Sequence, residues 1–288
     1  MRIAITADLH WGATNHPRGD EASRRLVAFL ERRPPDLLLI AGDVGAGPHF
    51  APCLELFAGL GCRKALVPGN HDVWVTEDDP RGDSYRVYRE HLPRLSAEYG
   101  FHYLDDGPLL LPEARLAVVG SMNWYDYSFA IEALRRRFPA ELHRLQSKRF
   151  SRVQHNDANF VRWAFDDVGF TREVTAALER HLQNALKQVP KAIVTTHHPP
   201  FYGLGFPRLL PPLTMDSLLW DAFLGNRTAE ELLAKHAASV PFAFCGHTHR
   251  ARENTLAGVR GYNVGSDYDS KRLLLLDWPS GKVESHGF

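Results

Sequence analysis

The sequence predicts an α/β fold with a largely parallel β-sheet, and two observations support this prediction. Short apolar runs alternate with helical patterns through residues 1–120, which is typical of consecutive βαβ units. In addition, five apolar runs along the chain are followed at once by Asp, Asn or His. Open α/β sheets gather their sites at the carboxyl ends of the strands, so we expect these polar residues to meet at one edge of the sheet.

The first three predicted strands are separated by two predicted helices. The strands are residues 2–7, residues 36–41 and the run that contains Leu66 and Val67. The helix at residues 20–33 has Asp20 as its expected N-cap and stops before Pro34. A shorter helix, residues 50–60, ends at Gly61.

The rest of the chain begins with a helix at residues 84–99 that Pro93 interrupts or kinks. Three short extended runs then suggest an antiparallel extension of the sheet: residues 101–104, 109–111 and 116–119. Residues 121–190 have a helical pattern and no clear strand, so we expect an inserted helical cap there. The strands resume at residues 191–196, 241–245, 258–264 and 273–278. We expect one domain, residues 1–288, that contains this cap.

The composition bounds the class of protein but not its activity. The 288 residues include 34 basic and 34 acidic side chains, and 44% are hydrophobic. A balanced charge gives no global attraction to nucleic acid or to an anionic membrane. Asp8 interrupts the first apolar run, so no secretory leader is expected, and no later run approaches the ~18 apolar residues of a membrane span. We expect a cytoplasmic protein without a membrane partner, either a monomer or a homodimer.

The three cysteines, Cys53, Cys62 and Cys245, lack CxxC spacing. This argues against a disulfide framework and against a cysteine zinc site. Cys245 precedes the Gly246-His247 turn, and we interpret it as a small buried hydrophobic residue rather than a ligand.

The polar residues after the five apolar runs form a consistent set of metal donors. The segments are Asp8-Leu9-His10, Gly42-Asp43, Gly69-Asn70-His71-Asp72, His197-His198 and Gly246-His247-Thr248-His249. They supply carboxylate, amide and imidazole groups and no thiolate. Such donors suit divalent ions of the manganese, iron, cobalt or zinc kind better than a structural zinc site. The predicted ligands are Asp8, His10, Asp43, Asn70, His197, His247 and His249. A single ion needs only three or four of them, so we expect two ions.

The order D-x-H, G-D, G-N-H-D, H-x-P and G-H-x-H resembles the calcineurin-like metallophosphoesterases over residues 8–249. The resemblance implies an α/β (α+β) four-layer sandwich of two mixed β-sheets flanked by helices, with an inserted helical cap. It also implies two divalent ions, Mn, Fe, Zn or Co. One ion would bind Asp8, His10 and His249, the other Asn70, His197 and His247, and Asp43 would bridge both.

The resemblance further implies hydrolysis of a phosphomonoester or phosphodiester by a metal-bridging water or hydroxide. His71 would stabilise the transition state and could protonate the leaving oxygen. Asp72 is a second catalytic candidate, because carboxylates often orient working imidazoles, but an exposed turn residue is an equal alternative.

Six residues are candidates for substrate binding: Asn123, Trp124, Tyr125, His198, Tyr202 and Arg250. Residues 121–127 follow a predicted strand and could form an aromatic wall over the site, or Trp124 and Tyr127 could anchor the cap to the core. His198 is the variable residue of H-x-P, and Arg250 beside His249 could meet a phosphate oxygen.

Two other function classes remain as alternatives. Basic residues in the cap, such as Arg135 and Arg149, suggest a nucleic-acid phosphodiesterase, but neighbouring acidic residues dilute this signal. A non-catalytic scaffold that only holds ions is the other alternative, although no ligand position has been lost. The G-D segment continues as Val44-Gly45 and lacks the V-D-R-G stretch of protein serine/threonine phosphatases, which weakens a phosphoprotein substrate. A small phosphorylated substrate is the partner that we expect.

Overall fold

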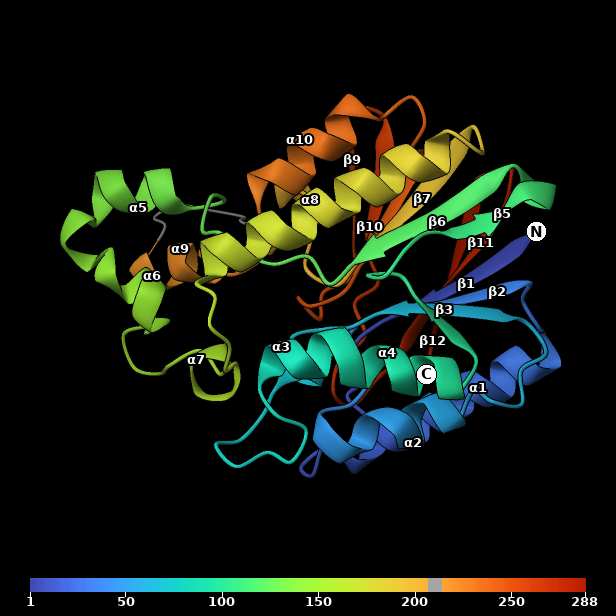
Figure 1. Ribbon diagram of the computed structural model, residues 1–288, viewed down its shortest axis with the longest axis horizontal. Coiled ribbons are helices and arrows are strands. Elements are labelled where there is room, and N and C mark those ends of the chain that lie inside the picture. The colour runs from blue at the N-terminus through green and yellow to red at the C-terminus, as the bar shows by residue number, and fades with distance from the viewer. Residues whose placement is uncertain (207–213) are drawn as a thin grey trace.

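The computed structural model describes residues 1–206 and 214–288. Two six-stranded sheets pack face to face, and helices cover their outer faces (Figure 1). This arrangement confirms the predicted four-layer sandwich. None of the helices in the described residues is long and apolar enough to cross a membrane.

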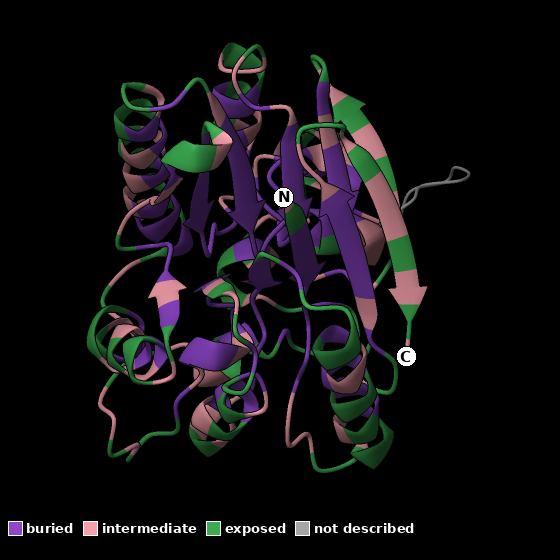
Figure 2. Cartoon of the chain, turned by 90° about the vertical axis from the view of Figure 1, so that its right-hand side faces the viewer, coloured by how far each residue is buried: buried purple, intermediate pink, exposed green. Residues whose placement is uncertain are grey.

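The first sheet has the strand order β12-β11-β1-β2-β3-β4. Its strands are β1 (Arg2–Thr6), β2 (Leu37–Ala41), β3 (Arg63–Val67), β4 (Phe101–Tyr103), β11 (Arg272–Asp277) and β12 (Lys282–Gly287). Strands β1 to β4 are parallel, and β11 and β12 are antiparallel to their neighbours. The last strand is a partly exposed edge that runs to the C-terminus (Figure 2).

The second sheet has the order β5-β6-β7-β8-β10-β9. Its strands are β5 (Leu109–Leu111), β6 (Leu116–Ser121), β7 (Lys191–Thr196), β8 (Phe242–Cys245), β9 (Arg252–Leu256) and β10 (Val259–Asn263). Strands β6, β7, β8 and β10 are parallel, so their carboxyl ends lie at one edge.

The alternation of side chains along each strand builds three apolar layers. In β2, Leu37 and Leu39 point into the layer between the sheets, whereas Leu38 and Ile40 pack against helices. In β7, Ile193 faces the first sheet. This double burial explains why β2 is apolar at every position. Figure 2 shows that the central strands are buried along most of their length. Cys245 is buried in β8, as predicted.

The helices fall into three groups (Figure 1). Those beside the first sheet are α1 (Pro17–Arg32), α2 (Phe50–Glu55), α3 (Ser84–Arg86) and α4 (Leu92–Glu98). Those beside the second sheet are α8 (Asp167–Leu186) and α10 (Arg227–Lys235). Those at one end of the molecule are α5 (Ile131–Arg137), α6 (His143–Ser147), α7 (Asp157–Phe160) and α9 (Met215–Ala222). The sequence analysis did not identify α9, α10, β9 or β12.

Several predicted boundaries were wrong, for local reasons. Helix α1 begins at Pro17, whose fixed φ suits a first helical position, and Asp20 instead accepts a hydrogen bond from the Gly12 N–H at 2.9 Å. Helix α2 is shorter than expected and ends at Glu55. The predicted interruption near Pro93 is a π-helical turn, Val87–His91, which leaves room for a residue without an N–H.

The predicted antiparallel extension is only partly present. Strand β4 pairs in parallel with β3 in the first sheet, and β6 pairs in parallel with β7 in the second. Only β5 is antiparallel, against β6. The chain therefore changes sheets between β4 and β5, which a pattern of short apolar runs does not reveal.

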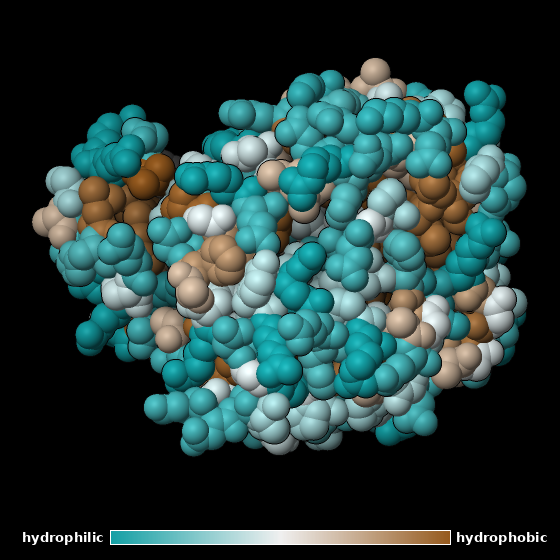
Figure 3. Space-filling model, viewed as in Figure 1, coloured by the Kyte–Doolittle hydropathy of each residue, from teal (hydrophilic) through white to brown (hydrophobic). Residues whose placement is uncertain are grey.

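We define the cap as residues 121–166, the part of the predicted insertion that precedes α8. Helix α8 itself lies along the second sheet, where Leu178 and Leu182 pack with Val119. The cap extends the molecule at one end, where hydrophobic side chains gather on the surface around α5 and α6 (Figure 3). A single domain with an insertion at about residues 121–190 remains our proposal.

One buried carboxylate anchors the cap to α8. Asp167, 5% exposed, accepts a hydrogen bond from Trp124 Nε1 at 2.9 Å and another from the Tyr127 hydroxyl. Lys148 Nζ lies 2.7 Å from its Oδ2. Three groups of the cap thus converge on one side chain at the start of α8.

We predict that Asp167→Ala lowers the free energy of unfolding by roughly 3 kcal/mol, because it leaves the ammonium of Lys148, whose side chain is only 13% exposed, and two buried donors without their acceptor. Urea denaturation followed by tryptophan fluorescence measures this loss. Glu132→Ala is the matched control, because that carboxylate is 79% exposed and paired only with Arg135. Equal stabilities of the two variants would contradict the anchoring role.

Candidate metal centre

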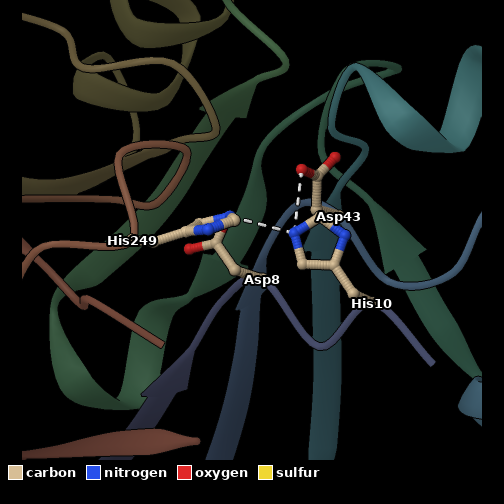
Figure 4. Close-up of side chains that lie close together, drawn as sticks. All are labelled: Asp8, His10, Asp43 and His249. Atoms are coloured by element: carbon tan, nitrogen blue, oxygen red, sulfur yellow. Dashed lines mark hydrogen bonds and ion pairs between the residues drawn. The ribbon is translucent and has the colours of Figure 1, made fainter. Parts of the chain in front are cut away.

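The predicted ligands meet at one edge of the sandwich because parallel strands from both sheets end there. Strands β1, β2 and β3 lead to Asp8, Asp43 and Asn70, and β7 and β8 lead to His197 and His247. Figure 4 shows four of these side chains, Asp8, His10, Asp43 and His249, turned toward one another.

The backbone is strained at this edge. Five predicted ligands adopt the left-handed conformation that L-residues rarely use: Asp8 (φ 53°), His10 (φ 43°), Asp43 (φ 51°), His247 (φ 74°) and His249 (φ 54°). Only five other non-glycine residues in the described part of the chain do so: Arg115, Asn123, Tyr127, Lys148 and Ala257. Each such residue costs of the order of 1–3 kcal/mol, and strain of this kind concentrates at functional sites.

Glycines allow the close approach of these loops. A Cβ on Gly69 would lie 2.1 Å from Asp43 Oδ1, and one on Gly246 would lie 2.6 Å from Asp8 Oδ2. Only residues without a side chain can bring the backbone this near to the two carboxylates.

The first donor group contains Asp8, His10, Asp43 and His249, whose ligand atoms all lie within 4.8 Å of one another. The Nε2 atoms of His10 and His249 are 3.0 Å apart, and His10 Nε2 is 3.5 Å from Asp43 Oδ2 (Figure 4). Asp8 Oδ2 is buried and has no hydrogen-bond partner among the described residues. A cation between these atoms would satisfy the unpaired oxygen and both imidazoles.

The second donor group contains Asn70, His197 and His247. His197 Nδ1 lies 3.0 Å from the carbonyl oxygen of Ala41, so an Nδ1–H would donate a hydrogen bond to it. The Nε2 atom would then keep its lone pair and could coordinate a metal. This Nε2 is 3.0 Å from Asn70 Oδ1 and 3.4 Å from Asp43 Oδ2. The His247 ring centroid lies 5.2 Å from that of His197. Asp43 Oδ2 is therefore near an imidazole of each group.

Burial by itself shifts the pKa values of the donor groups. It raises the pKa of Asp8 to about 8 and the pKa of Asp43 well above its usual value. It also lowers the pKa of His249 to about 4 and the pKa values of His10 and His197 well below the usual range. The histidines are thus neutral at pH 7, the form that binds metals, and the carboxylates need nearby positive charge to ionise. The donor set fits a pair of divalent cations.

His71 belongs to the same edge and also reaches a cavity. Its backbone N–H donates to Asp43 Oδ1 at 3.0 Å, and its ring stacks on Trp74 with centroids 3.6 Å apart. The ring lines a cavity of about 300 Å³ together with Asp43, Asn70 and His249. Burial lowers the pKa of His71 to about 3, so this ring too is neutral.

Asp72 does not orient the His71 ring, nor is it an exposed turn residue. It is buried and accepts hydrogen bonds from the backbone N–H groups of Gly69 at 2.8 Å, Gly45 at 2.9 Å and Val44 at 3.2 Å. Burial raises the pKa of Asp72 to about 6, although these N–H groups counteract the rise. Its contacts join the loops after β2 and β3, which is a structural function.

Asn123, Trp124 and Tyr125 are buried and do not line the cavity. Asn123 Oδ1 accepts from Asn226 Nδ2 at 2.7 Å, and Trp124 donates to Asp167. The aromatic segment therefore fits the anchoring alternative rather than the substrate wall.

The other substrate-binding candidates are also not among the residues that line the cavity. The Tyr202 hydroxyl donates to Asp221 Oδ2 at 3.1 Å, and Arg250 is exposed. His198 is buried behind His247, with ring centroids 4.2 Å apart. Its Nδ1 is 3.0 Å from the carbonyl oxygen of Asn123.

Sequence reasoning missed Asp157, a cap residue that contacts the site. It is buried, and its Oδ1 accepts from Asn70 Nδ2 at 2.9 Å and from Trp74 Nε1 at 2.8 Å. A second oxygen, Oδ2, accepts from the Tyr125 hydroxyl at 2.9 Å. Burial opposes ionisation, but nearby His155 and these hydrogen bonds outweigh it and lower the pKa of Asp157 to about 2.

A carboxylate can only accept hydrogen bonds, so Asp157 fixes which end of the Asn70 amide faces it. Nδ2 points to Asp157, and Oδ1 therefore points to His197, the neighbouring member of the second donor group. Tyr268 was also missed: its ring stacks on His10 with centroids 4.2 Å apart. Neither residue lies in a motif, so only their positions in the folded chain reveal them.

We predict that Asp157→Ala weakens binding of one of two Mn²⁺ ions about 10–100-fold, because Asn70 loses the contact that orients its amide. Titration calorimetry of the metal-free protein with Mn²⁺ measures the affinity. Tyr125→Phe is the matched control, since it removes a hydrogen bond to Oδ2 and keeps the Asn70 contact. An unchanged affinity in folded Asp157→Ala would rule out the orienting role.

Comparison with known proteins identifies relatives of the whole fold. The family model described as calcineurin-like phosphoesterase matches residues 1–251. No curated protein matches the chain. Among solved structures, phosphopantetheinyl hydrolase from Mycobacterium tuberculosis is similar at 21% identity and a TM-score of 0.66, covering 93% of this chain and 89% of that chain.

Two further structures share the fold. A dimetal phosphatase from Danio rerio is similar at 13% identity and a TM-score of 0.59, covering 100% of this chain and 98% of that chain. The protein TT1561 of Thermus thermophilus is similar at 13% identity and a TM-score of 0.56, covering 99% of this chain and 97% of that chain. At these identities the similarity supports the architecture.

Proposed function

The chain belongs to the calcineurin-like phosphoesterase family, hydrolases of phosphoester bonds, and we propose that it cleaves a small phosphomonoester or phosphodiester at a centre of two divalent metals. Asp8, His10 and His249 would hold one metal, Asn70, His197 and His247 would hold the other, and Asp43 would serve as a ligand to both. The identity of the metals, Mn, Fe, Zn or Co, is a matter for measurement.

The position of Asp43 is the observation that carries this proposal. Its Oδ2 lies 3.5 Å from His10 Nε2 and 3.4 Å from His197 Nε2, so one carboxylate oxygen faces both donor groups. A site for a single ion would leave one of these two imidazoles without a metal to coordinate. Two divalent cations, when bound, lower the pKa of water and offset negative charge on phosphoryl oxygens.

His71 is the proposed acid of the reaction. Its ring is held in plane by Trp74 and lines the cavity in which a phosphoester would lie. A neutral imidazole carries one N–H, which can donate a hydrogen bond to a phosphoryl oxygen; if the negative charge of a bound phosphoester raises the pKa of the ring, the imidazolium form can protonate the leaving oxygen. Trp74 is itself fixed by its hydrogen bond to Asp157, so the cap supports the orientation of His71.

The size of the cavity favours a small substrate over a nucleic acid. Its volume of about 300 Å³ is at the lower end of the range for small-molecule sites. Two cap arginines, Arg135 and Arg144, pair with Glu132 and Glu141, which reduces the positive charge available to a phosphate backbone. Phosphopantetheinyl esters, suggested by the name of the M. tuberculosis fold neighbour, belong in a substrate screen.

We predict that a chelator abolishes turnover of both p-nitrophenyl phosphate and bis-p-nitrophenyl phosphate, and that added Mn²⁺ restores it, because the proposed centre supplies the nucleophile. Metal analysis of the same samples should give about two ions per chain before chelation. Turnover that survives complete metal removal would sink the mechanism. Two bound metals with no activity on any ester in the screen would favour the scaffold alternative.

We also predict that His71→Ala lowers kcat about 10²–10⁴-fold without loss of bound metal, since the ring acts on the substrate. His143→Ala, at an exposed cap position, is the control and should keep wild-type turnover. If His71→Ala instead loses a metal, then His71 is a ligand or a structural residue.

A further inference from the structure

The cavity beside the proposed metal centre has a second wall, which no motif identified. Residues of the cap, of α9 and of the turn that follows α9 form it: Phe150, Val153, His155, Trp220 and Leu224. Two segments that are distant in sequence thus enclose the space in front of the site.

This wall exposes unusually large apolar side chains. Only three large hydrophobic residues in the described part of the chain are substantially exposed: Val153 (61%), Trp220 (43%) and Val168 (39%). Val153 and Trp220 both line the cavity. Exposed apolar surface that gathers in a concave site is typical of ligand binding, because a ligand removes it from water.

The wall is also firmly held. Trp220 stacks on Phe150 with ring centroids 4.6 Å apart, and Phe150 is only 2% exposed. The His155 ring packs edge-on against Trp220 at 5.7 Å. The Ser151 N–H and hydroxyl both donate to Asp216 Oδ1 at 2.9 Å, which ties this part of the cap to α9. The apolar surface is therefore preformed.

The cavity offers little to a second charged group. Among its described lining residues, Asp43 is the only Asp, Glu, Lys or Arg, and it belongs to the metal centre. The described lining residues thus include no Lys or Arg to pair with a second phosphate and no spare carboxylate to pair with an amine. Gln154 and Asn156 supply neutral amides.

We propose that the cap and α9 form an apolar subsite for the organic group of the phosphoester, and that the substrate carries an uncharged, aromatic-sized or short alkyl group next to its phosphoryl group. This inference rests on the proposed function, because the metal centre holds the phosphoryl end. The occupant is a small molecule, since the apolar surface is continuous with the cavity in which the chemistry occurs.

The test compares two phosphonates that differ only in their organic group, methylphosphonate and benzylphosphonate. Titration calorimetry with the Mn²⁺-loaded wild-type protein should show benzylphosphonate binding at least about tenfold more tightly, as expected for an aromatic group in an apolar pocket. Competitive inhibition of p-nitrophenyl ester turnover should show the same ratio.

Three variants locate the effect. Trp220→Ala and Val153→Ser should bring the affinity ratio close to one while methylphosphonate binds as before. Val168→Ala, which removes an exposed apolar group outside the cavity, should leave the ratio unchanged. Val153 is 61% exposed, so Val153→Ser keeps the test valid even if Trp220→Ala destabilises α9.

The outcomes separate the two proposals. If both phosphonates bind with equal affinity and esters are turned over, the apolar subsite is refuted and the proposed function stands. If neither phosphonate binds and no ester is turned over, both fail. An affinity ratio of one together with a dimer that Val153→Ser dissociates, measured by sedimentation, would mean that the apolar surface binds a second copy of the chain, which also overturns the subsite.

Discussion

The arrangement of the site depends on loops from both sheets that come together around one carboxylate, that of Asp43. Asp43 follows β2 of the first sheet, yet its Oδ2 lies within 3.5 Å of imidazoles from both sheets, His10 and His197. This is only achieved if the parallel strands of both sheets end at the same edge and the apolar layer between them fixes their separation. The alternation of Leu37 and Leu39 toward that layer therefore determines the geometry of the donors as well as the stability of the fold.

The site is costly for the folded state, and the surrounding structure offsets that cost. Predicted ligands in the left-handed conformation, a buried unpaired oxygen on Asp8 and several buried neutral histidines all oppose folding. Asp72 counters this by binding three backbone N–H groups across two loops, and Gly69 and Gly246 remove clashes. Bound cations would add stability by mass action, so part of the stability of the protein is expected to depend on metal.

The sequence could predict that the proposed ligands gather at one edge because each of them lies within four residues of the carboxyl end of a strand, so that local pattern and topology point the same way. It could not predict the roles of Asp72 and Trp124, since a buried acceptor and a buried aromatic residue have the same sequence pattern as functional ones. Asp157 and Trp220 were missed for another reason. Each reaches the site from a different helix, and no periodicity or motif records a contact between Asp157 and Asn70, which lie 87 residues apart. For the same reason, the sequence did not show that the chain passes from the first sheet to the second between β4 and β5.

In the proposed function, the cap connects recognition of the organic group to the orientation of the candidate metal ligands. Val153 and His155 face the cavity, and Asp157, two residues further on, fixes the amide of Asn70 and the indole of Trp74. A displacement of this segment would therefore alter the apolar wall, a proposed metal ligand and the support of His71 together. The side chain at position 153 could differ between relatives that bind different organic groups. A substitution of Asp157, in contrast, would disturb the orientation of the Asn70 amide. The proposed substrate subsite and the proposed metal ligands thus share a segment of five residues, 153–157, in which Asp157 contacts the ligand Asn70.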